Sequence, residues 1–192
     1  MKPMLTEQEI EIIEGCRKGD AACQKRLYDK YGPLIKGTCL RYTSDMAEAE
    51  DLFHDIFVHI LTHFDQYDHI TNLGGWLNRI TVNKAIDYVR RQSINDVVPM
   101  SQFEQVPGVS NDHYYDGIPM DVLLGFIQQL PPKMRTVFNL AVIDEMDQKE
   151  IVEMLQESTN NVRTMLSRAR AQLRTSIQKF WKKEEDNVKK YE

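Results

Sequence analysis

Two segments of the chain repeat hydrophobic residues with the period of an α-helix. In the first, seven apolar side chains recur about every 3.6 residues, at Leu52, Phe53, Ile56, Phe57, Ile60, Leu61 and Phe64. In the second, Val162, Leu166, Ala169 and Leu173 fall at i, i+4, i+7 and i+11. Each spacing predicts a helix that buries one face.

A short helix is predicted immediately before the second stripe. Asp147 and Glu150 have the spacing of a capping box, and apolar residues follow at once. The apolar period is interrupted after about two turns, at residues 156–158, where Ser158 is placed to cap the next helix. Two helices joined by a tight turn, the second polar and basic, predict a helix-turn-helix.

A further helix is predicted after the glycine pair Gly74 and Gly75, which is expected to end a loop. Its expected inward residues are Leu77, Ile80, Ala85, Tyr88, Val89 and the stem of Lys84. Its outward residues mix amides and cations with one acid, next to Trp76. Cations beside an aromatic ring suit unpaired bases and phosphates, although Trp76 by itself is more typical of a core residue.

Residues 96–118 have the composition of a linker, because Pro, Gly, Ser, Asn and Asp are frequent and no period is sustained. The predicted fold is all-α, with two small helical domains joined by this flexible linker and the helix-turn-helix in the second. The expected boundaries are 1–95 for the first domain, 96–118 for the linker, 119–183 for the second domain and 184–192 for a solvated tail.

The distribution of charge along the chain indicates a binding partner. The chain has a formal net charge of −5, yet residues 158–183 carry seven basic side chains and no acid, and residues 71–95 carry four basic and one acidic. Two basic islands in an acidic protein indicate that a nucleic-acid backbone is bound locally. The overall charge predicts that the free chain binds duplex weakly at physiological salt.

Other chemistry has little support. Cys16, Cys23 and Cys39 match no zinc or redox spacing and are expected to be buried, and no apolar run predicts a leader or membrane insertion, which favours the cytoplasm. His59 and His63 are i, i+4 neighbours near Asp55, but no further ligand completes a metal site. We therefore predict no catalytic residue, no metal and no cofactor.

Two alternatives belong to other classes. A helix-turn-helix repressor or activator acting alone accounts for the second basic island, and it normally requires a dimer. A helical metal-dependent hydrolase would use His54, Asp55, His59 and His63.

Four motifs, in residues 49–57, 76–91, 130–138 and 162–170, together resemble the bacterial extracytoplasmic-function (ECF) sigma factors. The resemblance covers most of residues 20–178. It implies a monomeric protein, not an enzyme, that binds core RNA polymerase, directs it to promoters and helps open the DNA. It also implies an anti-sigma factor as regulator.

The resemblance assigns residues to three surfaces. Contacts to core polymerase are expected at Asp51, Leu52, Asp55 and Phe57, with the apolar pair as support. Contacts of the first domain to promoter DNA, duplex and melted strand, are expected at Trp76, Arg79, Asn83, Lys84, Asp87, Arg90 and Arg91, with a base-capturing loop around residues 67–75. The recognition helix is expected to read duplex through Ser158, Thr159, Asn160, Asn161, Arg163, Thr164, Ser167, Arg168 and Arg170.

The chain departs from the family pattern at His54, Leu73, Gln156 and Met165, which replace Gln, an aromatic residue, Gly and a basic residue respectively. Leu73 and Met165 bear on base preference. Gln156 lies at the turn of the helix-turn-helix, where a left-handed conformation costs a residue with a Cβ atom about 1 kcal/mol.

Overall fold

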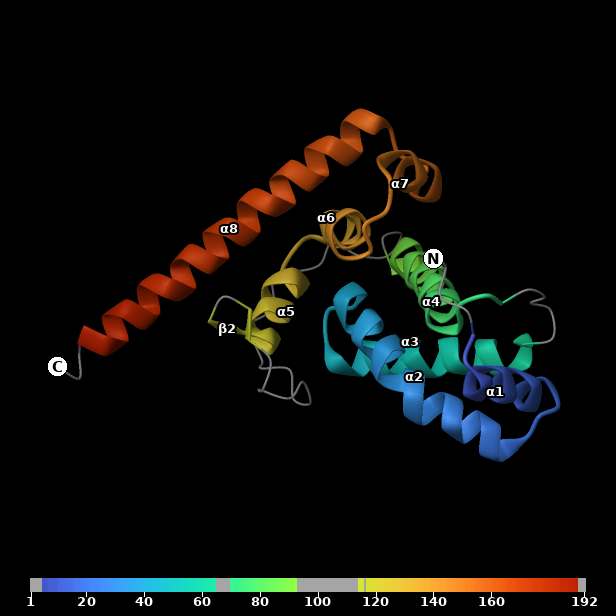
Figure 1. The fold of residues 1–192 in the computed structure, drawn as a ribbon. Coiled ribbons are helices and arrows are strands. Elements are labelled where there is room, and N and C mark those ends of the chain that lie inside the picture. The colour runs from blue at the N-terminus through green and yellow to red at the C-terminus, as the bar shows by residue number, and fades with distance from the viewer. Residues whose placement is uncertain (1–4, 65–69, 93–113, 116, 190–192) are drawn as a thin grey trace. The chain divides into compact units, whose positions relative to one another are not determined.

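The computed structural model describes residues 5–64, 70–92, 114–115 and 117–189. The chain divides into two compact units, residues 1–94 and 95–192 (Figure 1). The predicted all-α class is confirmed, because the described part of both units is helical apart from one short hairpin.

Unit 1 consists, in its described part, of α1 (Glu7–Arg17), α2 (Ala21–Tyr42), α3 (Met46–Thr62) and α4 (Leu73–Gln92). The long helix α2 packs against each of the other three, and α3 also packs against α4 (Figure 1). The predicted apolar stripe lies on α3 and is buried except for Leu61, which is half-buried. Phe64, the last member of the stripe, follows α3 and is completely buried.

Each helix of unit 1 begins at a side chain that accepts a backbone hydrogen bond. Thr6 and Glu9 form a capping box at α1, Asp20 accepts from the N–H of Ala22 at 2.8 Å, and Asp45 accepts from the N–H of Glu48 at 2.9 Å. These acceptors satisfy N–H groups that have no partner inside the first turn. The local sequence therefore fixes where the chain turns between helices.

The first turn of α4 corrects one prediction. Gly74 and Gly75 lie inside the helix rather than at the end of a loop, because Asn72 caps it and accepts from the Gly75 N–H at 3.0 Å. A Cβ atom on Gly75 would lie 3.2 Å from the Asn72 amide nitrogen. The absence of a side chain therefore lets the cap fold over the first turn.

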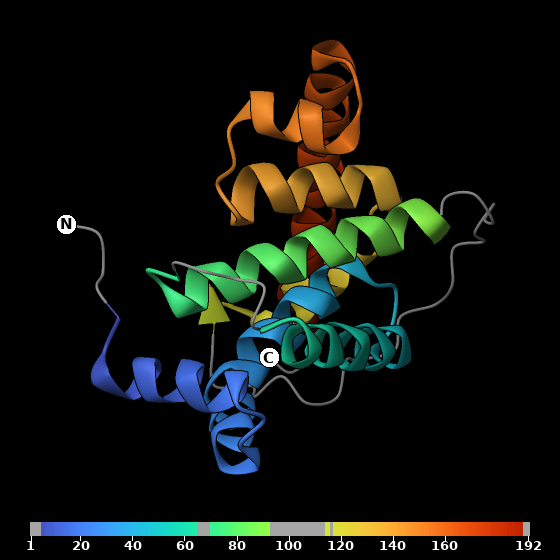
Figure 2. The same cartoon turned by 90° about the vertical axis from the view of Figure 1, so that its right-hand side faces the viewer.

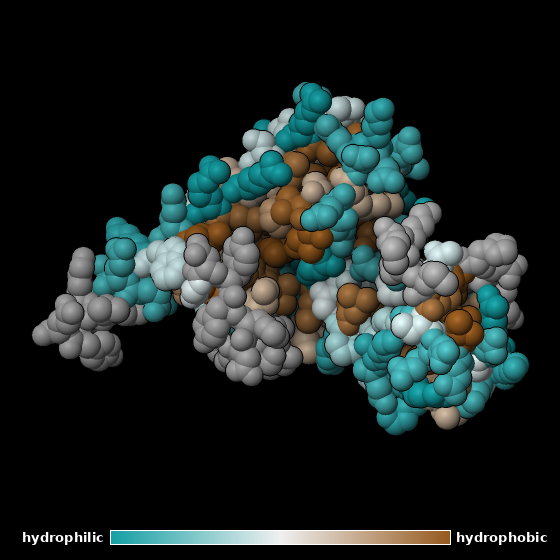
Figure 3. Space-filling model, viewed as in Figure 1, coloured by the Kyte–Doolittle hydropathy of each residue, from teal (hydrophilic) through white to brown (hydrophobic). Residues whose placement is uncertain are grey.

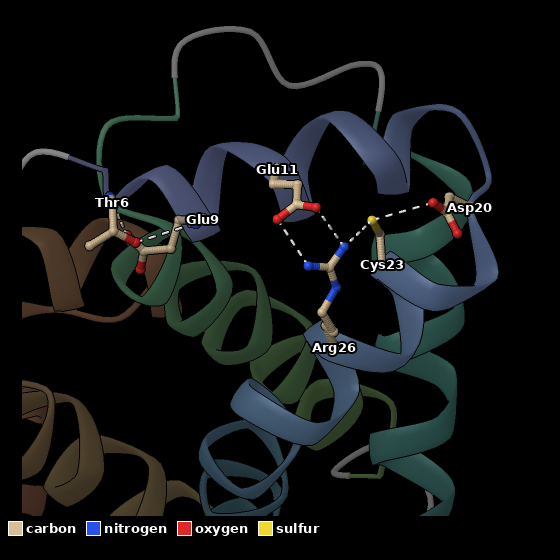
Figure 4. A network of polar contacts seen from close by, with 6 residues as sticks. All are labelled: Thr6, Glu9, Glu11, Asp20, Cys23 and Arg26. Carbon is tan, nitrogen blue, oxygen red and sulfur yellow. Dashed lines mark hydrogen bonds and ion pairs between the residues drawn. The ribbon is translucent and has the colours of Figure 1, made fainter.

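A polar network joins α1 to α2 (Figure 4). Arg26 donates to both oxygens of Glu11, at 2.9 and 3.0 Å, and to the Cys23 sulfur at 3.1 Å. All three cysteines are buried and free, which confirms their predicted role as core residues. Burial raises the pKa of Cys16 to about 11, with a further contribution from Cys23, and raises that of Cys39 to about 12. These two thiols are therefore uncharged at neutral pH.

Unit 2 begins its described part with an antiparallel pair of two-residue strands, β1 (Tyr114–Tyr115) and β2 (Ile118–Pro119). The helices follow as α5 (Met120–Gln128), α6 (Pro132–Phe138), the π-helical turn η2 (Asn139–Ile143), α7 (Gln148–Leu155) and α8 (Thr159–Lys189). The hairpin lies at the C-terminal end of the predicted linker, where Tyr115 pairs with Ile118. The linker prediction for residues 96–113 falls outside the described residues.

The core of unit 2 lies along α8, which packs against α5, α6 and α7. In Figure 2, α6 crosses in front of α8, which runs down the view behind it. Phe126, Leu130, Ala169 and Leu173 form the buried cluster, and Phe180 packs against it. The apolar spacing thus continues beyond residue 173, and α8 extends to Lys189. Residues 184–189 of the predicted tail are helical, and the side chains of residues 184–186 are exposed, as expected of a solvated segment.

Candidate nucleic-acid interface

The predicted helix-turn-helix is confirmed in α7, the following turn and α8. Glu150 accepts a hydrogen bond from the Asp147 N–H at 3.2 Å, at the start of α7. Gln156 is left-handed, with φ 53° and ψ 37°, and the Glu157 N–H returns to the Val152 carbonyl at 3.2 Å. Ser158 then accepts from the Asn161 N–H at 3.1 Å and starts α8. Gln156 thus adopts the conformation for which glycine is the usual residue.

The outward face of α8 carries the residues predicted for recognition. All nine are exposed: Ser158, Thr159, Asn160, Asn161, Arg163, Thr164, Ser167, Arg168 and Arg170. On the opposite side Val162 is 1% exposed and Ala169 is completely buried. The buried side fixes the helix to α6 and α7, so the polar side is presented to solvent on a rigid support.

Three hydrogen bonds connect the turn and its two helices with each other and with α6. Arg163 Nε donates to Gln148 Oε1 at 3.4 Å, which links α8 to α7. Asn161 donates to Glu157 at 3.1 Å, and Lys133 of α6 donates to the same carboxylate at 2.9 Å. Lys133 first, and then Asn161, holds the pKa of Glu157 below its ordinary value. The Glu157 carboxylate is therefore already paired with Lys133 and does not neutralise the arginines of α8.

Three arginines on the outward face of α8 form no ion pair within the described part of the chain. None of the ion pairs there involves Arg163, Arg168 or Arg170. Figure 3 shows hydrophilic side chains along the outer edge of α8 and hydrophobic ones beneath it. Exposed guanidinium groups with no neighbouring carboxylate favour an external anion.

The basic island at residues 71–95 lies, in its described part, on α4. Five of its predicted DNA-contacting residues are exposed, namely Arg79, Asn83, Asp87, Arg90 and Arg91, and Lys84 is half-buried. Arg90 forms an ion pair with Asp87 at 3.6 Å. Trp76 is half-buried, with its ring centroid 5.2 Å from that of the buried Phe64. The expected base-capturing loop includes residues 67–69, which lie outside the described residues, and Leu73 at its end is completely buried.

The face predicted to contact polymerase is only partly exposed. Asp51 and Asp55 are exposed on α3, one turn apart, but Leu52 is 3% exposed and Phe57 is 9% exposed. Phe57 packs instead against Tyr28, with ring centroids 5.2 Å apart. Helix α2 covers this side of α3, so the two apolar side chains lie in the core, where they can only support the exposed aspartates.

The histidines of α3 do not assemble into a wider cluster. The rings of His59 and His63 lie 4.2 Å apart, and His63 Nδ1 is 3.0 Å from the His59 carbonyl oxygen. Burial, and to a lesser extent Lys84 and His63, lowers the pKa of His59. Within the described ranges, no three His, Cys, Asp or Glu side chains are placed to hold a metal ion.

Comparison with known proteins identifies both units. The family model of sigma-70 region 2 matches residues 27–94, and that of sigma-70 region 4 matches residues 120–173. The chain is 30% identical over 180 residues to the ECF RNA polymerase sigma factor SigW of Bacillus subtilis strain 168, covering 86% of this chain and 94% of SigW. The chain belongs to the ECF sigma factors.

A second relative and one solved structure agree with this assignment. The ECF sigma factor SigM of Bacillus subtilis strain 168 is 30% identical over 152 residues, which cover 77% of this chain and 91% of SigM. The sigma factor RpoE of Bartonella quintana, solved with the anti-sigma factor NepR, has a similar fold, with a TM-score of 0.52 at 17% identity over 80% of this chain and 96% of RpoE.

Family membership gives the protein its function. As an ECF sigma factor it binds core RNA polymerase and directs it to specific promoters for transcription initiation. The region 2 match includes α3 and α4, and the region 4 match includes α7 and the first half of α8. Helix α1 and residues 174–189 lie outside both matches. In the described part of the chain no helix is long and apolar enough to cross a membrane.

Proposed function

We propose that this sigma factor divides its work among three exposed faces. The outward face of α8 reads the distal promoter element as duplex, the outward face of α4 binds the element near the start site and its melted strand, and Asp51 and Asp55 on α3 contact core polymerase. Residues 1–95 then act as the region 2 domain, residues 119–183 as the region 4 domain, and residues 96–118 as the connection.

The observation that carries the proposal is the set of unpaired cations on α8. A recognition helix in the major groove must present polar side chains to base edges and cations to phosphates while its other face remains packed. Arg163 and Arg168 lie on the exposed side, opposite the buried Val162 and Ala169. A solvated surface helix would typically pair such arginines with nearby acids.

The α4 face supports contact with an opened strand. Arg79 and Arg91 can follow a flexible backbone, and Asn83 offers an amide to an unpaired base. Trp76 is half-buried against Phe64, so we assign it to support of this face, with its exposed edge toward the nucleic acid. The bound polymerase performs the chemistry of RNA synthesis, and the sigma factor itself catalyses no reaction.

The acidic α3 face suits a basic protein surface. Two carboxylates one turn apart guide association by charge and set its specificity more than its affinity. The same face is available to a regulator, and the Bartonella sigma factor was solved together with an anti-sigma factor. We propose that an anti-sigma factor competes for this face, and that the free protein is a cytoplasmic monomer.

Two charge-changing double variants separate the faces. Arg163→Ala with Arg168→Ala should abolish promoter-specific run-off transcription but leave the pull-down of core polymerase intact. Asp51→Arg with Asp55→Arg should weaken the pull-down itself. Glu7→Arg with Glu14→Arg, on exposed positions of α1 outside the family match, adds the same charge as a control and should affect neither assay. Circular dichroism must show that each variant is folded. Loss of the polymerase pull-down in the folded Arg163→Ala, Arg168→Ala variant, or an intact pull-down in the folded Asp51→Arg, Asp55→Arg variant, would contradict the division.

A further inference from the structure

One row of arginines on α8 extends beyond the part of the helix that matches region 4. The row is Arg163, Arg170 and Arg174, and the region 4 match ends at residue 173. At 3.6 residues per turn, Arg170 and Arg174 lie about 20° to either side of Arg163 around the helix axis. The three cations therefore share one narrow face, on one flank of the recognition surface.

The row lines a shallow groove. Its volume is about 370 Å³, and its lining consists of Arg163, Leu166, Ser167, Arg170, Ala171 and Arg174. Leu166 and Ala171 give it an apolar floor, and the Ser167 hydroxyl adds a donor between the cations. No carboxylate contributes to the lining, and within the described residues none forms an ion pair with these arginines.

The spacing of these like charges favours the binding of an anion between them. Arg170 and Arg174 are four residues apart, the spacing at which like charges on a helix repel each other. From Arg163 to Arg174 the row measures about 16 Å at 1.5 Å per residue. A DNA strand carries one charge for about every 3.4 Å of its axis, so a row of this length can follow several phosphates.

We propose that Arg163, Arg170 and Arg174 form a phosphate-binding row that holds the backbone of one promoter strand beside the recognition helix. This inference rests on the proposed role of α8, and it adds Arg174 as a positioning residue outside the family match. Arg168 lies about 140° around the helix from Arg163, on the other flank. The two flanks place cations on both sides of the face that reads the bases.

Backbone contacts and base contacts have different experimental signatures. A phosphate contact contributes to affinity for every sequence and steepens the dependence of binding on salt, by about 0.9 in the slope of log affinity against log salt. Arg174→Gln should therefore lower that slope by about 0.9. By the same relation it should weaken holoenzyme binding about five-fold at 0.15 M salt, equally for promoters of different sequence.

The experiment measures binding of the holoenzyme, assembled from this protein and core polymerase, to fluorescent promoter fragments over a salt series. Arg174→Lys, which keeps the charge, should retain most of the slope. Lys179→Gln removes a charge from an exposed position of the same helix on the other flank, and should leave the slope unchanged. An equal fall in slope for Arg174→Gln and Lys179→Gln, or no fall for Arg174→Gln, overturns the inference.

A further variant separates this inference from the proposed function. Arg163→Gln with Arg168→Gln should weaken promoter binding whether α8 contacts only the bases or also holds the phosphate backbone. If that variant is active at all promoters, the α8 surface itself is wrongly assigned. If it fails while Arg174→Gln retains the full slope, the recognition helix stands and the phosphate row alone is refuted.

Discussion

The left-handed turn at Gln156 predicts that glycine there stabilises unit 2. The turn holds Gln156 at φ 53°, where a Cβ atom costs roughly 1–2 kcal/mol. Glycine removes that cost but gains freedom in the unfolded chain worth roughly 0.5–1 kcal/mol. Gln156→Gly should therefore raise the free energy of unfolding of unit 2 by about 0.5–1 kcal/mol. The Gln156 side chain is exposed, so its loss removes little packing.

Urea unfolding measures this difference. The chain has two tryptophans, Trp76 in unit 1 and Trp181 in unit 2, so a Trp76→Phe background makes tryptophan fluorescence report unit 2. With a slope of about 1–3 kcal/mol per molar urea, the midpoint should rise by about 0.5 M. Gln156→Ala is the control, because it keeps the Cβ atom and should give no gain. Equal midpoints for the Gly and Ala variants would refute the reasoning.

Three further predictions concern unit 1 and the whole chain. Gly15→Ala should lower the stability of unit 1 by about 1–3 kcal/mol, because the new Cβ atom would lie 2.1 Å from the Cys23 sulfur. Gly37→Ala, within α2, has nothing within 4 Å of its Cβ atom and should raise the stability by up to about 1 kcal/mol. Similar melting temperatures for the two variants would contradict this. The Thr6 N–H, and next Tyr31, hold the pKa of Glu9 below its ordinary value of 4.5. The ionised Glu9 carboxylate therefore stabilises unit 1 above pH 4.5, and this stabilisation is lost as the pH falls through the pKa of Glu9 in the folded protein. Glu9→Gln should cost about 1 kcal/mol at pH 7, and this deficit should shrink as the pH falls below 4.5. A deficit that is independent of pH would argue against the carboxylate. Finally, the net charge of −5 predicts that the protein retains promoter duplex at about 150 mM salt only with core polymerase attached, and tight specific binding by the free chain would refute this.

Much of the helix-turn-helix was predictable, because its signals lie within a few residues of one another. Capping residues, an apolar period and an interruption of that period specify α7, the turn and the start of α8. Equivalent signals mark the starts of α1 and α2, in the Thr6–Glu9 capping box and the Asp20 cap. Asn72 similarly marks the start of α4, but the glycine pair that follows it is typical of a loop and indicated a later start.

The length of α8 was not predictable from charge. The acidic residues after Lys183 indicated a solvated tail, but the helix continues because Ile177 and Phe180 pack against the core formed with α5. The hairpin before α5 was also missed, since Gly117 and the strands around it lie in a segment whose composition is typical of a loop. In both cases contacts between distant segments stabilise a structure that local composition disfavours.

The helical class, the position of the turn and the two basic islands follow from the chain alone, because period, caps and charge are properties of neighbouring residues. Which side chains remain available to a partner depends instead on how the helices pack. Asp51 and Leu52 are adjacent in sequence, yet packing of α2 against α3 buries the leucine and leaves the aspartate exposed. Burial depends on what covers a face, and the residues that cover it come from distant parts of the chain.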